Sequence, residues 1–355
     1  MALRVEPGLS SSVPPLTPSR SADRPIDEAG TVTSSEAAEA GSPSPARRRG
    51  ARLAAPVGIV GVVVGCLVPW RAAMHSGLSG DVFWQLASGR WMLDHHQILR
   101  QDVFSYTVLG RHWLTPEWGY QVLLAAAVRQ LGPVAFWLLS AGTATLTVLA
   151  VTARCRRYGT GWTWTGIIAL TCGAAMAVFS RDRPEMVSYL LLAVLMLILT
   201  LARSHRGWLV VVPLLCAIWA NDHGRYVLAL AVLVLEPLAA VRPLPLGPLV
   251  ATDPLPLRAV SLTLVACVLA TLVNPDGWGI YPYTIRLTFN PTIGRLIAEW
   301  QSPDFHVLVL LVLVAGPFAV TAAYFLLSHN TVPVIDLLLA RALLIATLES
   351  VRFLP

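Results

Sequence analysis

Apolar blocks of about the length of a membrane span follow one another through most of the chain, with polar turns between them. They cover residues 54–74, 133–153, 162–180, 186–202, 207–220, 226–241, 258–273 and 306–327, and a last block starts near residue 334. A helix needs about 17–25 predominantly apolar residues to cross the hydrocarbon core of a bilayer. The pattern therefore predicts an all-α polytopic membrane protein with about nine transmembrane helices.

Composition supports this class. Hydrophobic residues make up 55% of the chain and charged residues only 13%, whereas a soluble domain has about 25% charged residues. The net charge of +6 points to orientation in a lipid bilayer rather than to nucleic acid, so no nucleic-acid partner is expected. The five cysteines lack metal-ligand spacing and are expected to be small buried hydrophobes.

The distribution of arginine predicts the orientation. Residues 1–53 are rich in Ser, Pro, Ala and Glu and are expected to be a disordered tail, and residues 54–355 to be the membrane domain. Arginines precede the first predicted span and follow the second, and positive residues beside spans remain in the cytoplasm. The N-terminus is therefore expected to be cytoplasmic, and the short apolar stretch 118–131 not to cross. The apolar ending at Pro355 leaves a C-terminal truncation open.

Under this topology the first outer loop, residues 79–117, is the longest polar segment among the spans. Asp81 lies at its start and is well placed to cap a helix. Trp84 and Trp91 are seven residues apart and therefore share one side of that helix. Two interpretations stay open: an interfacial helix with a capping aspartate and tryptophan anchors, or a catalytic aspartate.

Other polar candidates gather on the same predicted outer face. They are Asp102 and Glu117 in the first loop, Arg181, Arg183 and Glu185 in one short turn, and Asn221, Asp222, His223 and Arg225 in another. Ionisable groups at the hydrocarbon edge are costly and usually serve a site or pair with one another. Arginine and histidine beside a flexible glycine suit a phosphate group. Structural roles remain open for each of these residues, since acidic residues also face outward by default.

Several short motifs occur together in a specific order. They are Gly80-Asp81-Val82-Phe83-Trp84, Asp102-Val103-Phe104-Ser105-Tyr106, Arg183-Pro184-Glu185, Trp219-Ala220-Asn221-Asp222-His223-Gly224 and Glu299-Trp300-Gln301. In this order they resemble bacterial integral-membrane proteins of the GT-C glycosyltransferase class, close to lipid-linked-sugar transferases that resemble protein mannosyltransferases. The resemblance covers about 54–355.

The resemblance implies a GT-C-like fold with a long first extracytoplasmic loop, in a bacterial cell membrane. It implies a donor sugar on a polyprenyl phosphate and an envelope glycan, lipid or protein as acceptor. Asp81 would be the general base, and arginine and histidine of the outer turns would bind the lipid phosphate. The sequence identifies no cofactor or metal site, although a divalent cation is compatible with the acidic residues. The chain departs from the resemblance in one respect, because its first loop lacks an adjacent acidic pair. The alternative function is that of a non-catalytic membrane protein, namely a transporter, flippase or scaffold of envelope assembly.

Overall fold

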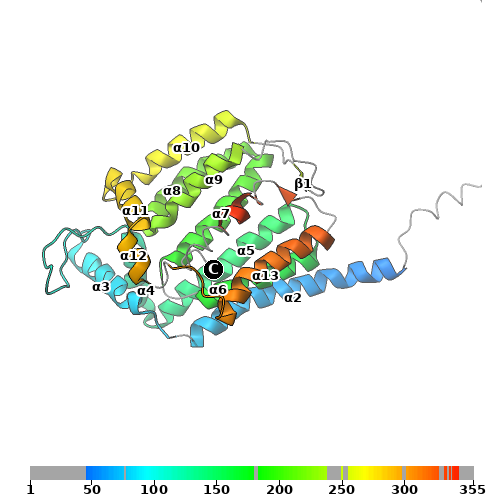
Figure 1. Cartoon of the computed structure of the whole chain (residues 1–355), viewed down its shortest axis with the longest axis horizontal. Coiled ribbons are helices and arrows are strands. Elements are labelled where there is room, and N and C mark those ends of the chain that lie inside the picture. The colour runs from blue at the N-terminus through cyan, green and yellow to red at the C-terminus, as the bar shows by residue number, and fades with distance from the viewer. Residues whose placement is uncertain are drawn as a thin grey trace, which may run out of the picture. The chain divides into compact units, whose positions relative to one another are not determined.

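Helices make up most of the described chain in the computed structural model (Figure 1). The structure describes residues 45–75, 77–179, 183–237, 249–250, 255–297, 301–327, 332–333, 336 and 338–343. The first part contains α2 (Pro45–His75), α3 (Gly80–His95), α4 (Trp118–Leu131), α5 (Val134–Arg157), α6 (Trp162–Phe179) and α7 (Glu185–Ser204). Next come η1 (Arg206–Val210), α8 (Val211–Asp222), η2 (Gly224–Tyr226), α9 (Val227–Leu235) and β1 (Leu249–Val250). The last part contains α10 (Leu257–Thr271), η4 (Gly277–Gly279), α11 (Ile280–Thr288), α12 (Pro291–Leu296), α13 (Leu308–Leu327) and β2 (Val332–Pro333).

Three of the described helices are long and apolar enough to cross a membrane. They are Ala54–His75 within α2, all of α5 and all of α7, and they match the predicted blocks 54–74, 133–153 and 186–202. Helices α6, α10 and α13 are apolar but shorter. The same holds for Gly224–Leu235, the stretch made of η2 and α9. The structure thus supports a largely helical membrane protein. Most of the predicted last span, from residue 334, lies outside the described residues.

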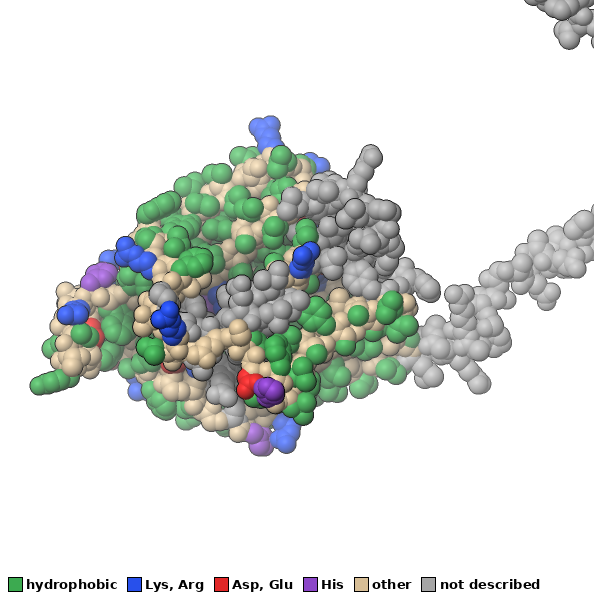
Figure 2. All heavy atoms as spheres, in the orientation of Figure 1, with side chains coloured by type: hydrophobic (Ala, Val, Ile, Leu, Met, Phe, Trp, Pro, Cys, Tyr) green, Lys and Arg blue, Asp and Glu red, His purple; other side chains and the backbone are tan. Residues whose placement is uncertain are grey.

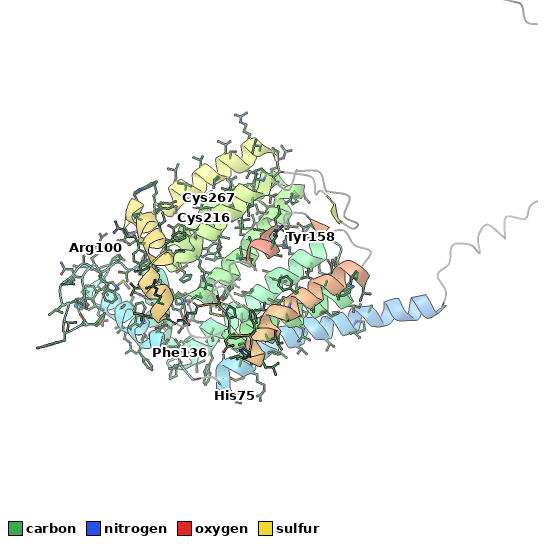
Figure 3. All side chains as sticks on the ribbon, viewed as in Figure 1. His75, Arg100, Phe136, Tyr158, Cys216 and Cys267 are labelled. Atoms are coloured by element: carbon green, nitrogen blue, oxygen red, sulfur yellow. The ribbon has the colours of Figure 1, made fainter. Side chains whose placement is uncertain are left out.

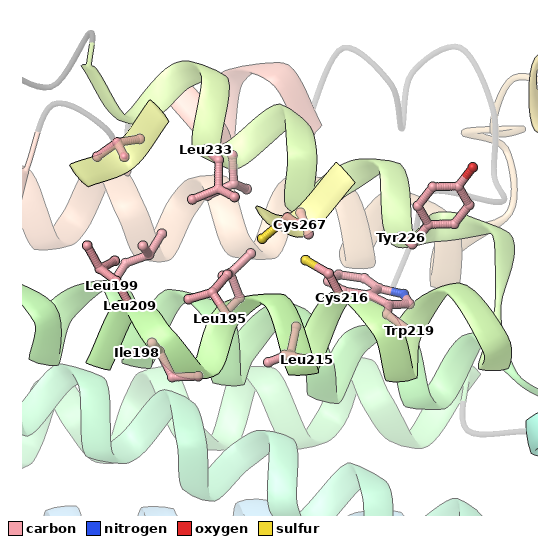
Figure 4. Packing of buried hydrophobic residues seen from close by; sticks show 14 of the residues in the cluster. Leu195, Ile198, Leu199, Leu209, Leu215, Cys216, Trp219, Tyr226, Leu233 and Cys267 are labelled. Carbon is pink, nitrogen blue, oxygen red and sulfur yellow. The ribbon is translucent and has the colours of Figure 1, made fainter. Parts of the chain in front are cut away.

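Within the unit from Arg49 onward, neighbouring helices follow a simple order. Figure 1 shows α8, α7 and α5 side by side; α10 packs on α8, and α6 packs on α5. The largest hydrophobic core lies between α7, α8, α9 and α10, with Trp219 and Tyr226 fully buried (Figure 4). Cys216 and Cys267 are buried in this core, and no described cysteine forms a disulfide. The prediction that cysteines act as buried hydrophobes is confirmed for this pair.

The two strands pair in parallel, with Leu249 opposite Val332 and Val250 opposite Pro333.

The outer surface of the helices is also apolar. On α10, Leu257, Leu262, Val265 and Leu269 each expose more than half of their surface. Figure 2 shows hydrophobic side chains over much of the visible face. A helix that is hydrophobic on the outside as well as on the core side is expected in lipid rather than in water.

Glycines bring α2 and α6 into backbone contact. A Cβ added at Gly65 would come within 2.5 Å of the Ala169 carbonyl oxygen, and one at Gly173 within 2.1 Å of the Gly65 carbonyl oxygen. Between membrane helices, small residues allow this close approach, and van der Waals contact between backbones then stabilises the pair. These glycines position the first predicted span against the third.

The predicted first outer loop begins with a helix of 16 residues. Helix α3 begins at Gly80 with Ser79 as its N-cap residue, and Asp81 lies within the first turn. The prediction that Asp81 caps this helix is therefore wrong, since the N-cap residue is Ser79, two residues earlier. A carboxylate in the first turn still interacts favourably with the helix dipole. The predicted helix 118–131 is present as α4 with the same bounds.

Candidate functional site

A cavity of about 360 Å³ opens between the first loop, α3, α4, the start of α7 and α11. Four of the residues singled out from the sequence line it: Asp81, Glu117, Arg183 and Glu185. The other lining residues are Trp84, Gln85, Trp113, Leu114, Thr115, Pro116, Gln121, Pro184, Tyr283 and Leu287. The cavity thus combines carboxylates, a guanidinium group, amides and aromatic rings.

Asp81 and Arg183 form an ion pair at this cavity. The Arg183 Nη2 atom is 3.0 Å from Asp81 Oδ2, and the two side chains are 24% and 50% exposed. Asp81 comes from the first turn of α3, whereas Arg183 directly precedes Pro184, the N-cap residue of α7. The fold therefore joins the start of α3 to the turn before α7 through opposite charges. Because the pair is partly solvated, its electrostatic contribution to stability is small.

Two side chains from distant parts of the chain, Gln85 of α3 and His223 between α8 and η2, contact Glu117. Gln85 Nε2 of α3 donates a hydrogen bond to Glu117 Oε2 at 2.5 Å. His223 Nε2 lies 3.7 Å from Glu117 Oε1. Glu117 itself is the N-cap residue of α4, so its backbone is fixed at the start of that helix. Its carboxylate therefore has a defined orientation at the edge of the cavity.

A buried chain of hydrogen bonds orients His223. Trp219 Nε1 donates to Ser188 Oγ at 2.8 Å, and Ser188 Oγ is 2.8 Å from His223 Nδ1. All three side chains are buried. The indole N–H can only donate, so the serine oxygen accepts there and its own hydroxyl proton is available for His223 Nδ1. When Ser188 donates this proton to Nδ1, the ring proton of neutral His223 lies on Nε2, the atom nearest Glu117.

The rest of the Asn221 to Arg225 turn supports the site without lining it. Trp118 Nε1 donates to Asn221 Oδ1 at 2.6 Å, and Asn221 Nδ2 donates to the Val273 carbonyl oxygen at 2.7 Å. Asp222, two residues beyond the predicted span 207–220, lies against Gly119, where an added Cβ would come within 2.8 Å of Asp222 Oδ1.

Burial raises the pKa of Asp222 to about 6. The Arg225 guanidinium lies over the Tyr189 ring, 5.2 Å from its centroid. Neither side chain lines the cavity, so any direct contact of these two residues with a ligand remains a prediction.

Asp102 stabilises the remainder of the first loop. Its Oδ1 atom accepts the backbone N–H groups of Phe104 and Ser105, and its Oδ2 atom accepts the Ser105 hydroxyl at 2.6 Å. The hydroxyl of Ser105 and these N–H groups hold the pKa of Asp102 below its usual value. Asp102 is buried and does not line the cavity, so the structure gives it a turn-forming position. Arg181, also predicted to bind substrate, lies outside the described residues.

Arg100 ties this loop to a distant turn. Its Nη2 atom donates to the Pro275 carbonyl oxygen at 2.9 Å, and Figure 3 labels Arg100 within the loop. Trp84 and Trp113 also contact each other, with ring centroids 6.4 Å apart in an edge-to-face arrangement. The loop is therefore tied to a distant turn at Arg100 and to α3 at Trp113, and only the second contact is at the cavity.

Sequence reasoning missed the two glutamines of the cavity and the buried Ser188–Trp219 pair. One signal was available for the glutamines, because Gln85 follows Asp81 by four residues and Gln121 follows Glu117 by four. Residues at this spacing share a helix face. No comparable local signal exists for Ser188, since its contacts come from other helices.

Among the described residues, no group of three or more His, Cys, Asp or Glu side chains is arranged to hold a metal ion.

A scan against protein-family models found no match for this chain. Searches of curated proteins and of solved structures also found no match.

Proposed function

We propose that this protein is a membrane-embedded glycosyltransferase of GT-C-like architecture that transfers a sugar from a polyprenyl-phosphate donor. The observation that carries the proposal is one cavity that holds Asp81, Glu117 and Arg183 next to Trp84 and Trp113. Carboxylates can accept a hydroxyl proton, a guanidinium group can bind a phosphate, and aromatic rings can cover the apolar face of a sugar.

In the proposed reaction, the acceptor hydroxyl attacks the anomeric carbon of the donor sugar. A new carbon–oxygen bond forms, and the bond between the anomeric carbon and the phosphate oxygen breaks with its electron pair on the phosphate. The Asp81 carboxylate takes the hydroxyl proton as general base. Arg183, 3.0 Å from Asp81, stabilises the charge on the leaving lipid phosphate.

The proposed topology has about nine spans and a cytoplasmic N-terminus in a bacterial cell membrane, with the cavity on the extracytoplasmic face. Orientation is measured by cysteine labelling in intact cells. A membrane-impermeant reagent is expected to modify a cysteine introduced at His112, an exposed loop position, and to miss one introduced at Tyr158, at the end of α5. Labelling of the Tyr158 position alone would reverse the topology.

The activity test uses purified protein in lipid nanodiscs with labelled polyprenyl-phosphate pentoses and hexoses. Asp81→Asn keeps the size of the side chain and its ability to accept from Arg183, but it removes the base. Loss of roughly 10²–10⁴-fold in transfer rate is expected, the usual contribution of general-base catalysis. Asp94→Asn is the matched control, because Asp94 lies on the same helix with its side chain 62% exposed.

Two outcomes would contradict the proposal. Transfer at the parental rate by Asp81→Asn would remove the base assignment. A parent protein that binds but never consumes any lipid-linked sugar would favour a scaffold or flippase, for which the outer carboxylates should be individually dispensable.

A further inference from the structure

Two buried glutamine side chains at the cavity have amide atoms without a hydrogen-bond partner among the described residues. Gln121 is 1% exposed, and neither its Nε2 nor its Oε1 atom has a hydrogen-bond partner among the described residues. Gln85 is 2% exposed; its Nε2 donates to Glu117, but its Oε1 atom has no partner. Both residues line the cavity. Buried polar groups are nearly always hydrogen-bonded in native proteins, so this pair requires an explanation.

The position of Gln121 is fixed by its backbone rather than by its amide. Its N–H donates to the Glu117 carbonyl oxygen at 3.0 Å. Gly89 of α3 packs directly on this part of α4, and a Cβ added there would come within 1.9 Å of the Gln121 carbonyl oxygen. The helix contact therefore holds the residue in place whatever its side chain does. A Leu or Met at this position would fill the same space at a lower desolvation cost.

We infer that Gln85 and Gln121 form a hydroxyl-binding subsite for a polyhydroxylated ring, with Gln121 as the residue that determines specificity. An amide carries both donors and an acceptor in one plane, and each sugar hydroxyl is both donor and acceptor. Neighbouring hydroxyls on one ring can therefore satisfy the Gln121 Nε2 and Oε1 atoms together. The identification of the ring with the transferred sugar rests on the proposed function; the subsite itself does not.

The arrangement also predicts which ligands the subsite prefers. A site with buried polar groups rejects analogues that lack the matching hydroxyl, since the protein group is then left unpaired. Trp84 and Trp113 line the same cavity and provide apolar contact for the carbon face of the ring. The subsite should therefore prefer a ring over a linear polyol of similar polarity.

The test measures stability and binding on the same variants. Gln121→Met removes the amide with little change in volume, and Gln130→Met is the control on an exposed position of the same helix. Thermal midpoints of the full chain in nanodiscs are measured without ligand and with methyl pentosides, methyl hexosides and sorbitol. Without ligand, Gln121→Met is expected to melt a few degrees above the parent, since an unpaired buried amide is removed. At least one methyl glycoside should raise the midpoint of the parent, and Gln121→Met should bind it at least tenfold more weakly.

Several results would overturn the inference. They are a lower midpoint for ligand-free Gln121→Met, unchanged glycoside affinity in that variant, or no response of the parent to any glycoside. Gln121→Leu removes the same amide and is measured in parallel; failure of both variants to fold would assign the amide a structural role and overturn the inference as well. A parent that binds glycosides through Gln121 but transfers no lipid-linked sugar would refute the proposed function and leave the subsite intact.

Discussion

Buried polar groups at the two ends of the helical bundle differ in how they are paired. Tyr158 follows the last residue of α5, and Figure 3 labels it at one end of that helix. At this end two cations each face a carboxylate from another part of the chain. Arg154 pairs with Asp336, and Arg203 pairs with Glu236 at 2.5 Å. Positive and negative charges are therefore equal in number in this described cluster.

Phe136 is near the other end of α5, and it packs with Val82 and Leu124 beside the cavity. Three carboxylates and one guanidinium group line the described part of this cavity. Gln85 Oε1 and both polar side-chain atoms of Gln121 have no hydrogen-bond partner there among the described residues. At the first end the charged groups pair within the chain, although the buried Glu236 Oε2 and Thr152 Oγ1 atoms have no hydrogen-bond partner among the described residues. At the second end an entire buried amide, that of Gln121, has none. Such incomplete pairing at one location is typical of a binding site rather than of a supporting contact.

The largest effect is expected at the paired end. Glu236→Leu leaves Arg203 buried without this carboxylate, and breaking a buried ion pair costs about 3–5 kcal/mol of unfolding free energy. The double variant Glu236→Leu with Arg203→Met should recover most of that loss, because both charges are then gone. Denaturant unfolding in detergent micelles measures both. Parental stability in the single variant would show that the pair is solvated, and the contrast between the two ends would fail.

At the cavity end, the contact between α3 and α4 offers a steric test. Gly89→Ala places a Cβ within 1.9 Å of the Gln121 carbonyl oxygen, and overpacking of this kind costs about 1–3 kcal/mol. Glycoside binding should weaken as well, since the helices separate at Gln121. Gly80→Ala on the same helix is the control, because its added Cβ meets nothing within 4 Å. Equal stability and binding in the two variants would mean that the two helices adjust freely.

Two substitutions at His223 separate its two contacts. Asn places its amide near the position of Nδ1 and can keep the Ser188 contact, whereas Gln reaches further and can keep a donor directed at Glu117. If the contact with Glu117 orients that carboxylate, His223→Asn should lower the transfer kcat by about tenfold or more, corresponding to a hydrogen bond to a charged group. His223→Gln should retain more of the rate. The opposite order, at matched thermal midpoints, would assign His223 to support of Ser188 alone.

The smallest effect concerns pH and the first loop. The folded pKa of Asp102 is lowered, so its contribution to stability is complete above the unfolded value of about 3.8 and is lost as pH falls through the folded pKa. Ser105→Ala removes the largest cause of the lowering. Acid opening of the loop should therefore start at a slightly higher pH than in the parent. Proteolysis of the loop across a pH series measures this, with Thr107→Ala, at an exposed loop position, as the control. Identical pH curves for the two variants would remove Asp102 as the loop's organising group.

Local pattern was enough to predict much of the fold. Helices at 118–131, 133–153 and 186–202 follow from the lengths of their apolar blocks, and the structure contains each of them. Helix starts were less predictable, because one polar residue can replace another as the N-cap. Asp81 was predicted as the cap of its helix, but Ser79 takes that position.

The candidate site was predicted in part. Asp81, Glu117, Arg183 and Glu185 were selected because they are ionisable residues at the edge of apolar blocks, and all four line the cavity. Asp102 was selected as an acidic residue of the predicted first outer loop, but it forms a turn through local hydrogen bonds. Hydropathy cannot separate these cases. It indicates where a residue lies relative to the apolar segments of the chain, but not the direction in which its side chain points.

The sequence by itself determined that the chain forms apolar helices and where most of them lie, because the number of apolar residues needed for a span is a local quantity. Only the tertiary structure decided which turns meet. Close contacts at Gly89, between α3 and α4, and at Gly119, between α4 and the end of α8, accompany the pairing of Asp81 with Arg183 and of Glu117 with His223. In lipid, an apolar face has little preference for one apolar neighbour over another, so helix pairing depends on shape and on a few polar contacts. That information is distributed over residues far apart in the sequence, and it appears only when the helices are packed.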